Sequence, residues 1–180
     1  MDQCAEQVVL VDDAGQPVGT ADKIGVHGAD TPRHLAFSCY GFDADGRLLV
    51  TQRALDKRTF PGFWTNTCCG HPAPGEELAE AVRRRLDHEL ALVPTDLRLV
   101  LPDFSYTAEY AGIVENELCP VFVCRLAGEP RPRADEVAAH QWWPWDRFLD
   151  EAADPGSAIS PWARLQAPLL RDLVPTSARV

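Results

Sequence analysis

The sequence predicts a single domain with an α+β or α/β sandwich fold. The chain has 180 residues, of which 46% are hydrophobic, and this length and composition suit one ordinary buried core. Short β-prone runs are spread along the chain, and one amphipathic helix lies between them. Strands and helices mixed in this way pack in layers. We therefore expect one domain over residues 1–180, with its core at about residues 8–175.

The strands are predicted from apolar runs that are bounded by turn residues. VVLVD at residues 8–12 is such a run, and DDAGQP follows it as a turn. LAFSCYGFDADGRLLVTQR contains two β-prone runs around Asp-Ala-Asp-Gly, which is typical of a β-hairpin. Further strands are predicted in LRLVLPDFSYTAEY, ENELCPVFVCRL and VAAHQWWPW.

The central helix is predicted in EELAEAVRRRLDHEL. Leu78, Val82, Leu86 and Leu90 follow one another at intervals of four residues and form one apolar face. Acidic residues stand in the first turn, where they suit the positive end of the helix dipole. Pro94 lies shortly beyond the expected end.

Two shorter helices are predicted near the C-terminus. DRFLDEAA has the pattern of a short helix. SPWARLQAPLLRDL begins with Ser160 as a candidate N-cap and Pro161 at the first helical position. Pro168 lies inside this last pattern, and we expect it to kink or split the helix.

Composition limits the classes of partner and cofactor. The net charge of −10, from 17 Lys+Arg and 27 Asp+Glu, argues against general binding to nucleic acid or to an anionic membrane. The stretch MDQCAEQVVLVDDAG is too acidic for a signal peptide, and we expect a cytoplasmic protein. No dinucleotide-binding fingerprint follows a strand, so nothing points to a flavin or a nicotinamide. The six cysteines show no C-x-x-C spacing, and we expect reduced thiols.

Three histidines and two glutamates are candidate ligands of a divalent metal. His27 and His34 flank the turn-rich segment GADTPR, and His71 follows a Cys-Cys-Gly stretch. Glu115 and Glu117 stand two residues apart, so that both carboxylates project from one face if the chain is extended there. This mixed nitrogen and oxygen set suits Mg²⁺, Mn²⁺ or Zn²⁺. Surface histidines and acids without a shared function remain the alternative, because spacing alone does not bring distant regions together.

The central helix also carries part of a Nudix box, G-x5-E-x7-R-E-U-x-E-E. Gly70, Glu76 and Arg84 stand at the right intervals, but Arg85 occupies the place of the first helix glutamate. Glu89 is the one clear metal ligand that remains. The pattern indicates a helix that faces phosphate without hydrolysing it.

Five motifs occur in a fixed order over roughly residues 8–165: HLAFSCYGF, LLVTQRAL, PGFWTNTCCGHP, GIVENELCPVF and SPW. In these motifs and their order the sequence resembles the type 1 isopentenyl-diphosphate isomerases, a metal-dependent family with the Nudix fold. TNTCCGHP together with ENE is the most specific part. The resemblance implies a Nudix-like αβα sandwich with a mixed sheet. It also implies interconversion of isopentenyl and dimethylallyl diphosphate in isoprenoid precursor biosynthesis, by a monomer or weak homodimer.

The resemblance assigns roles to individual residues. The catalytic set is Cys69, directly before Gly-His-Pro, with Glu117 and Tyr106. The metal ligands are His27, His34, His71, Glu115 and Glu117, holding Mn²⁺, Mg²⁺ or Zn²⁺, and Glu89, associated with a Mg²⁺ that bridges to the diphosphate. The substrate-binding set is Lys23, Arg53, Lys57 and Arg85 around the diphosphate, with Trp162 facing the hydrocarbon.

The implied reaction explains why these residue types are needed. An unactivated double bond isomerises by protonation of a carbon, which forms a tertiary carbocation, and by loss of a proton from a neighbouring carbon. Two acid/base groups are therefore wanted, and Cys69 and Glu117 can supply them. We expect the metal cluster to bring the pKa of the Cys69 thiol near the operating pH. Cys68 should face away from this chemistry, whereas Trp64, beside the cysteine loop, is expected to line the pocket.

Two other functions remain as alternatives. A Nudix pyrophosphohydrolase would release phosphate or monophosphate, would need an intact glutamate helix and would have no use for Cys69. A metal-stabilised binding module would close its metal site with protein ligands. The departures from the family pattern are Ala91 in place of a helix-end glycine, Gln52 before Arg53, and Pro168.

Overall fold

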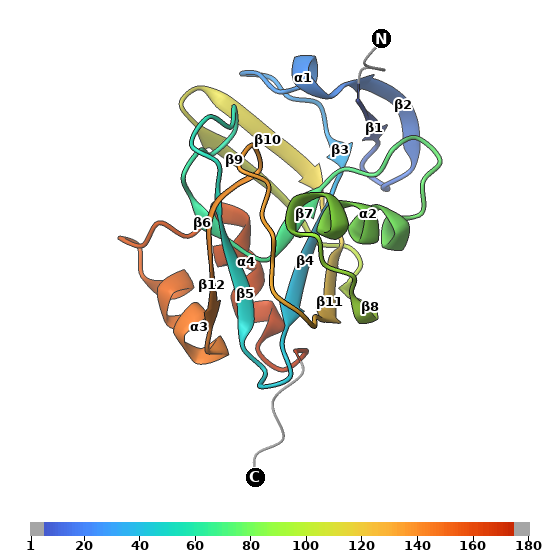
Figure 1. The fold of residues 1–180 in the computed structure, drawn as a ribbon. Helices are drawn as coiled ribbons and strands as arrows, with labels where there is room; N and C mark the ends of the chain where they lie inside the picture. The colour runs from blue at the N-terminus through green and yellow to red at the C-terminus, as the bar shows by residue number, and fades with distance from the viewer. Residues whose placement is uncertain (1–5, 175–180) are drawn as a thin grey trace.

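The computed structural model describes residues 6–174 and contains two mixed β-sheets with four helices in that part of the chain (Figure 1). The larger sheet has the strand order β12-β5-β4-β11-β8, and the short strands β6 and β7 pair with β5 and β4. Its strands are β4 (Phe37–Phe42), β5 (Leu48–Arg53), β6 (Trp64–Thr65), β7 (Cys68–Gly70), β8 (Thr95–Leu101), β11 (Val121–Arg125) and β12 (Val137–Trp143).

The smaller sheet has the order β2-β1-β3-β10-β9. Its strands are β1 (Gln7–Val11), β2 (Pro17–Asp22), β3 (His34–Leu35), β9 (Ser105–Tyr110) and β10 (Ile113–Leu118). The helices are α1 (Lys23–Val26), α2 (Leu78–Leu90), α3 (Trp145–Ala153) and α4 (Pro161–Leu170). No helix within residues 6–174 is long and apolar enough to cross a membrane.

Helices cover both faces of the larger sheet, which makes the predicted αβα sandwich (Figure 1). Successive side chains of a strand point to opposite faces. Thus Val121 and Val123 of β11 pack with α3 and α4, whereas Phe122 and Cys124 pack against α2. The continuous apolar runs of the sequence follow from this, because a strand that is covered on both sides needs apolar residues at every position.

The predicted hairpin between β4 and β5 is present, but its two strands separate soon after the turn. They pair directly at Phe42 and Leu48. Beyond that point β7 pairs with β4 and β6 pairs with β5, so the TNTCCG segment enters between them. The Thr67 hydroxyl joins the two sides, since it donates to Leu49 O at 2.7 Å and accepts from Gly41 N at 2.7 Å. The cysteine loop is therefore part of the sheet and is held in a fixed position.

The last helix begins where the sequence predicted but continues through its proline. Ser160 stands at the N-cap and Pro161 at the first helical position. The Ser160 hydroxyl does not cap the helix; it lies 2.8 Å from the Thr65 hydroxyl. The helix runs unbroken past Pro168 to Leu170, so the expected split is wrong. Pro168 is only two residues from the helix end, where few helical hydrogen bonds remain to be lost.

The C-terminus of α2 gives a testable prediction of stability. Ala91 caps the helix in the left-handed region, with φ 54° and ψ 40°, a conformation that costs a residue with a Cβ atom more than it costs glycine. We expect Ala91→Gly to raise the free energy of unfolding by about 0.5–1 kcal/mol in urea titrations. The control Ala79→Gly, inside the same helix, should lower it by about 1 kcal/mol. A loss of stability in both variants would contradict the expectation for Ala91.

Candidate active site

One cavity of about 790 Å³ collects most of the residues that the sequence singled out. It lies between the two sheets beside the cysteine loop, and side chains from α2 and α4 also line it. The predicted site residues that line it are Lys23, His27, Arg53, Lys57, Cys69, His71, Arg85, Glu89, Tyr106, Glu115, Glu117 and Trp162. His34 is fully buried behind this wall, and Trp64 is elsewhere.

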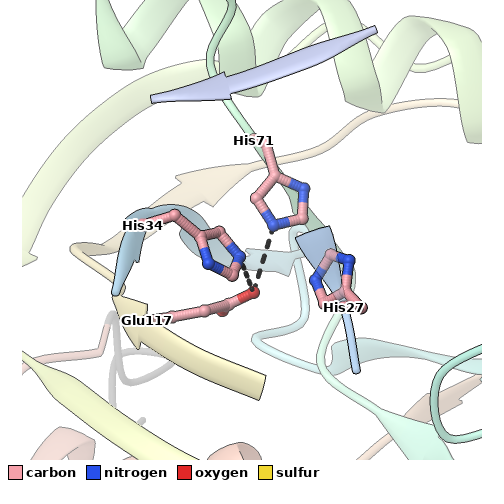
Figure 2. A group of neighbouring side chains, drawn as sticks. All are labelled: His27, His34, His71 and Glu117. Atoms are coloured by element: carbon pink, nitrogen blue, oxygen red, sulfur yellow. Dashed lines mark hydrogen bonds and ion pairs between the residues drawn. The ribbon is translucent and has the colours of Figure 1, made fainter. Parts of the chain in front are cut away.

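Four of the five expected metal ligands form a tight group (Figure 2). The ligand atoms of His27, His34, His71 and Glu117 all lie within 4.8 Å of one another. Glu117 Oε1 is 3.1 Å from His71 Nε2 and 3.5 Å from His34 Nε2. The strand register explains part of this geometry, because β10 runs parallel to β3 and places Glu117 beside His34.

The protonation of the imidazoles fits a metal centre. His27 Nδ1 donates to Lys23 O at 3.0 Å, and His34 Nδ1 donates to Pro32 O at 2.9 Å, which leaves the lone pair on Nε2 of each ring. Both Nε2 atoms, and Nδ1 of His71, are buried without a hydrogen-bond partner. Burial lowers the pKa of His27 and of His71, which favours the neutral form that binds metals. Burial acts in the same direction on His34, but the adjacent Glu117 carboxylate outweighs it and raises the pKa of His34. The unsatisfied Nε2 atoms of His27 and His34, close to the Glu117 carboxylate, suit a divalent ion.

Glu115 lies beside this group and not in it. The two carboxylates project from one face of β10, as the spacing predicted, and the Tyr106 hydroxyl joins them. Its oxygen lies 2.8 Å from Glu115 Oε2 and 2.9 Å from Glu117 Oε2, so its single proton is donated to the pair. Burial, together with the charge of Glu117, raises the pKa of Glu115. The hydroxyl and the two carboxyl groups thus form a site that can hold and pass a proton.

The two adjacent cysteines pack in different core clusters on opposite sides of the sheet, as expected, but both of them line the cavity. Cys68 packs with the α2 cluster, and its Sγ lies 3.6 Å from Glu89 Oε1. Cys69 packs against the other cluster, and its thiol donates to Asn66 Oδ1 at 3.3 Å. Burial raises the pKa of Cys69 to about 12, although hydrogen bonds with Ser38 and Asn66 act against it. Without a metal ion the thiol is therefore protonated at neutral pH, and the lower pKa expected beside a bound metal stays a prediction.

The four predicted cationic side chains line the cavity, and three of them form ion pairs with glutamates. Lys23 pairs with Glu6. Arg85 pairs with Glu89 at 2.6 Å and with Glu136 at 3.1 Å, and Lys57 also pairs with Glu136. Glu136 could not be predicted as a partner of these cations, because it precedes β12 outside any recognisable motif.

Arg53 is held differently from the other cations. Its Nη2 donates to Thr59 O at 2.8 Å, and its guanidinium lies 5.5 Å from the centre of the Trp162 ring. Arg58 also lines the cavity and was missed. It belongs to the basic run RALDKR, which was the available signal, and it donates to the His27 carbonyl at 3.0 Å.

The structure separates the two tryptophans that were expected to line the pocket. Trp162 lines the cavity, and its Nε1 donates to Asn66 Oδ1 at 3.1 Å. Trp64 does not: its ring stacks on Trp143 at 5.8 Å and borders a separate pocket of about 270 Å³. The reason is the alternation along β6, since Thr65 faces the main cavity and its neighbour must face away. The prediction for Trp64 is wrong.

The comparisons with known proteins agree on one family. The NUDIX domain model matches residues 32–163. Isopentenyl-diphosphate Delta-isomerases of Mycolicibacterium vanbaalenii and Frankia alni are 61% and 56% identical, over 92% and 88% of this chain and 92% and 82% of theirs. A Deinococcus radiodurans structure has a TM-score of 0.68 at 20% identity, covering 89% of this chain and 96% of that one. The chain belongs to the Nudix domain family and, within it, to the isopentenyl-diphosphate Delta-isomerases.

Proposed function

We propose that this chain interconverts isopentenyl diphosphate and dimethylallyl diphosphate by proton transfer through a tertiary carbocation. One observation carries the proposal: the Cys69 thiol and the Glu117 carboxylate line the same cavity. The curated relatives, named Isopentenyl-diphosphate Delta-isomerase, support the same reaction. A pyrophosphohydrolase is disfavoured because Arg85 replaces a glutamate of the hydrolytic helix and because hydrolysis does not need a buried thiol.

The reaction needs one proton added and another removed. Protonation of the terminal CH₂ carbon of isopentenyl diphosphate leaves the positive charge on the tertiary carbon, and loss of a proton from C2 gives dimethylallyl diphosphate. Cys69 holds one exchangeable proton, and Tyr106 holds another between Glu115 and Glu117. The reaction is reversible, so each group donates in one direction and accepts in the other.

We propose that His27, His34, His71 and Glu117 hold one divalent metal ion, with Glu115 beside them as a further ligand. Three nitrogen donors and a carboxylate suit Zn²⁺ or Mn²⁺ better than Mg²⁺, which prefers oxygen ligands. A bound ion supplies positive charge that keeps Glu117 ionised. A Mg²⁺ near Glu89, associated with the diphosphate, completes the proposed set of ions.

The substrate's two ends are assigned to different residues, which meet where the Arg53 guanidinium lies over the Trp162 ring. Lys23, Arg53, Lys57 and Arg85 surround the diphosphate, and this remote binding energy holds the small hydrocarbon in place. Trp162 faces the hydrocarbon, where an indole stabilises a desolvated cation by about 2 kcal/mol. Water must also be kept from the cation, because it would otherwise capture the cation as an alcohol.

We further propose that the single domain of residues 1–180 acts as a monomer or weak homodimer in the cytoplasm. Its partner would be the small-molecule diphosphate alone, without nucleic acid or membrane. The net charge of −10 supports this restriction, because a polyanion would be repelled.

Replacement of a single histidine tests the metal site. His71→Ala is expected to lower the bound metal per chain severalfold after gel filtration, because one ligand of the proposed centre is lost. Metal content is measured by inductively coupled plasma mass spectrometry. His140→Ala, on strand β12, is the control and should retain its metal. Equal metal content in both variants would remove His71 from the ligand set.

The proposed activity is tested by the products. The chain is incubated with isopentenyl diphosphate and Mg²⁺ or Mn²⁺, and the mixture is followed by ¹H and ³¹P NMR. We expect dimethylallyl signals with both phosphorus atoms retained in the diphosphate. Orthophosphate or monophosphate would indicate the hydrolase, and an unchanged substrate would indicate a binding module.

A further inference from the structure

A buried line of hydrogen-bonded polar side chains connects the protein core to the Cys69 sulfur, and only its last member, Ser38, lines the cavity. It begins at Tyr40 on strand β4, passes through Gln166 on helix α4, and returns to Ser38 on β4, which touches the thiol. Tyr40, Gln166 and Ser38 are each 0% exposed. Tyr40 and Gln166 do not line the cavity, so substrate does not reach them. Burying three polar groups is costly unless they are paired, which calls for an explanation.

The hydrogen bonds along this line have a direction. The Tyr40 hydroxyl donates to Gln166 Oε1 at 2.8 Å. That contact turns the amide so that Gln166 Nε2 donates to Ser38 Oγ at 3.0 Å. Because Ser38 Oγ already accepts on this side, its own hydrogen is free to point elsewhere.

Two sulfur atoms compete for the Ser38 hydroxyl. Cys119 Sγ lies 3.4 Å from Ser38 Oγ, and Cys69 Sγ lies 3.6 Å from it. The Cys69 thiol already donates to Asn66 Oδ1 at 3.3 Å. If the Cys119 thiol donates to the second lone pair of Ser38 Oγ, this oxygen accepts two hydrogen bonds, from Gln166 and from Cys119. The hydroxyl hydrogen of Ser38 is then donated to the Cys69 sulfur.

We propose that Ser38, oriented by Gln166 and Tyr40, is a positioning residue that directs a hydrogen bond onto the Cys69 sulfur. This inference rests on the proposed isomerase function. When Cys69 gives its proton to the substrate carbon, the S–H bond breaks, a C–H bond forms, and the electron pair stays on sulfur. The Ser38 O–H stabilises that negative charge and keeps its own proton. A preorganised donor of this kind acts mainly on the step in which charge develops.

Tyr40→Phe tests the inference because it changes the line at the end farthest from the substrate. Without the tyrosine hydroxyl, the Gln166 amide is free to turn over, and Ser38 then donates to Gln166 in place of sulfur. We expect kcat to fall about 10-fold, and about 10- to 100-fold in Ser38→Ala, with KM within about twofold of the unmodified chain. A thermal melt of each variant confirms that it is folded at the assay temperature.

A double-mutant cycle separates this role from general packing. If Tyr40 acts through Ser38, Tyr40→Phe should have no further effect on kcat in the Ser38→Ala background. An equal loss in both backgrounds, or no loss in Tyr40→Phe alone, would overturn the inference. Should Ser38→Ala fail to fold, Gln166→Met is used in its place, because it removes the hydrogen bond from Gln166 to Ser38. Cys119→Ala is the matched control: it touches the same hydroxyl, and its kcat should stay within about twofold.

A spectroscopic readout tests the same contact without turnover. The S–H stretching band of Cys69 is identified as the infrared band that Cys69→Ser removes. It should shift in Tyr40→Phe and in Ser38→Ala and should keep its position in Cys119→Ala. An unshifted band in the first two variants would reject the Ser38 contact, even in a chain without isomerase activity. Lack of turnover in the unmodified chain would instead contradict the proposed function.

Discussion

Cys69→Ser is expected to lower kcat by about 10³-fold or more. A serine hydroxyl at this position keeps the shape of the side chain and can still donate to Asn66. It is a far weaker acid than a thiol, so it transfers a proton to carbon much more slowly. The fold should remain intact, because the replacement changes one buried atom. The rate is measured by conversion of isopentenyl diphosphate at saturating concentration.

The neighbouring thiol provides the control for this prediction. Cys68 packs on the α2 face of the sheet, and a serine there can donate to Glu89, whose carboxylate lies 3.6 Å from the present sulfur. We therefore expect only a mild change in kcat for Cys68→Ser. Comparable activity in the two variants would show that the reactive thiol has been assigned to the wrong cysteine.

Glu117→Gln is expected to abolish most of the turnover and to release bound metal. The carboxylate lies at the centre of the site, 3.1 Å from His71 Nε2, 3.5 Å from His34 Nε2 and 2.9 Å from the Tyr106 hydroxyl. Burial alone would raise the pKa of Glu117, but the adjacent His34 and His71 imidazoles outweigh it and hold that pKa well below its usual range. An amide keeps the volume and removes both the charge and the base.

We expect kcat to fall by about 10³-fold or more in Glu117→Gln, since an acid/base group and the negative charge that holds a cation disappear together. Metal content and activity are measured on the same preparation. Glu109→Gln, at an exposed position of β9, is the control for loss of one carboxylate from this sheet. Full metal occupancy with normal turnover in Glu117→Gln would exclude Glu117 from both roles.

Local pattern was sufficient for the parts of the fold that depend on side-chain periodicity. The four-residue intervals from Leu78 to Leu90 predicted α2, and the two-residue interval between Glu115 and Glu117 predicted carboxylates on one face of a strand. The opposite directions of Cys68 and Cys69 followed from the same rule. In each case the answer depends on backbone geometry, which sequence spacing determines directly.

The features that could not be predicted depend on contacts between distant segments. Trp64 faces away from the cavity because β6 enters between two separated strands, and no local pattern announces that separation. Glu136 reaches Lys57 and Arg85 across 79 and 51 positions of the chain. The contact between Ser38 and Gln166 joins residues that are 128 positions apart. The pKa of Cys69 also depends on how deeply tertiary packing buries it.

The position of deuterium in the product tests the central claim most directly. Isopentenyl diphosphate is incubated with the metal-loaded chain in heavy water, and the product is examined by ¹H and ²H NMR before the reaction reaches equilibrium. Proton transfer through Cys69 and Glu117 predicts dimethylallyl diphosphate with one deuterium in a methyl group, because the acid/base groups exchange with solvent before they protonate the terminal carbon. Dimethylallyl diphosphate without deuterium, or release of phosphate in place of isomerisation, would contradict the account.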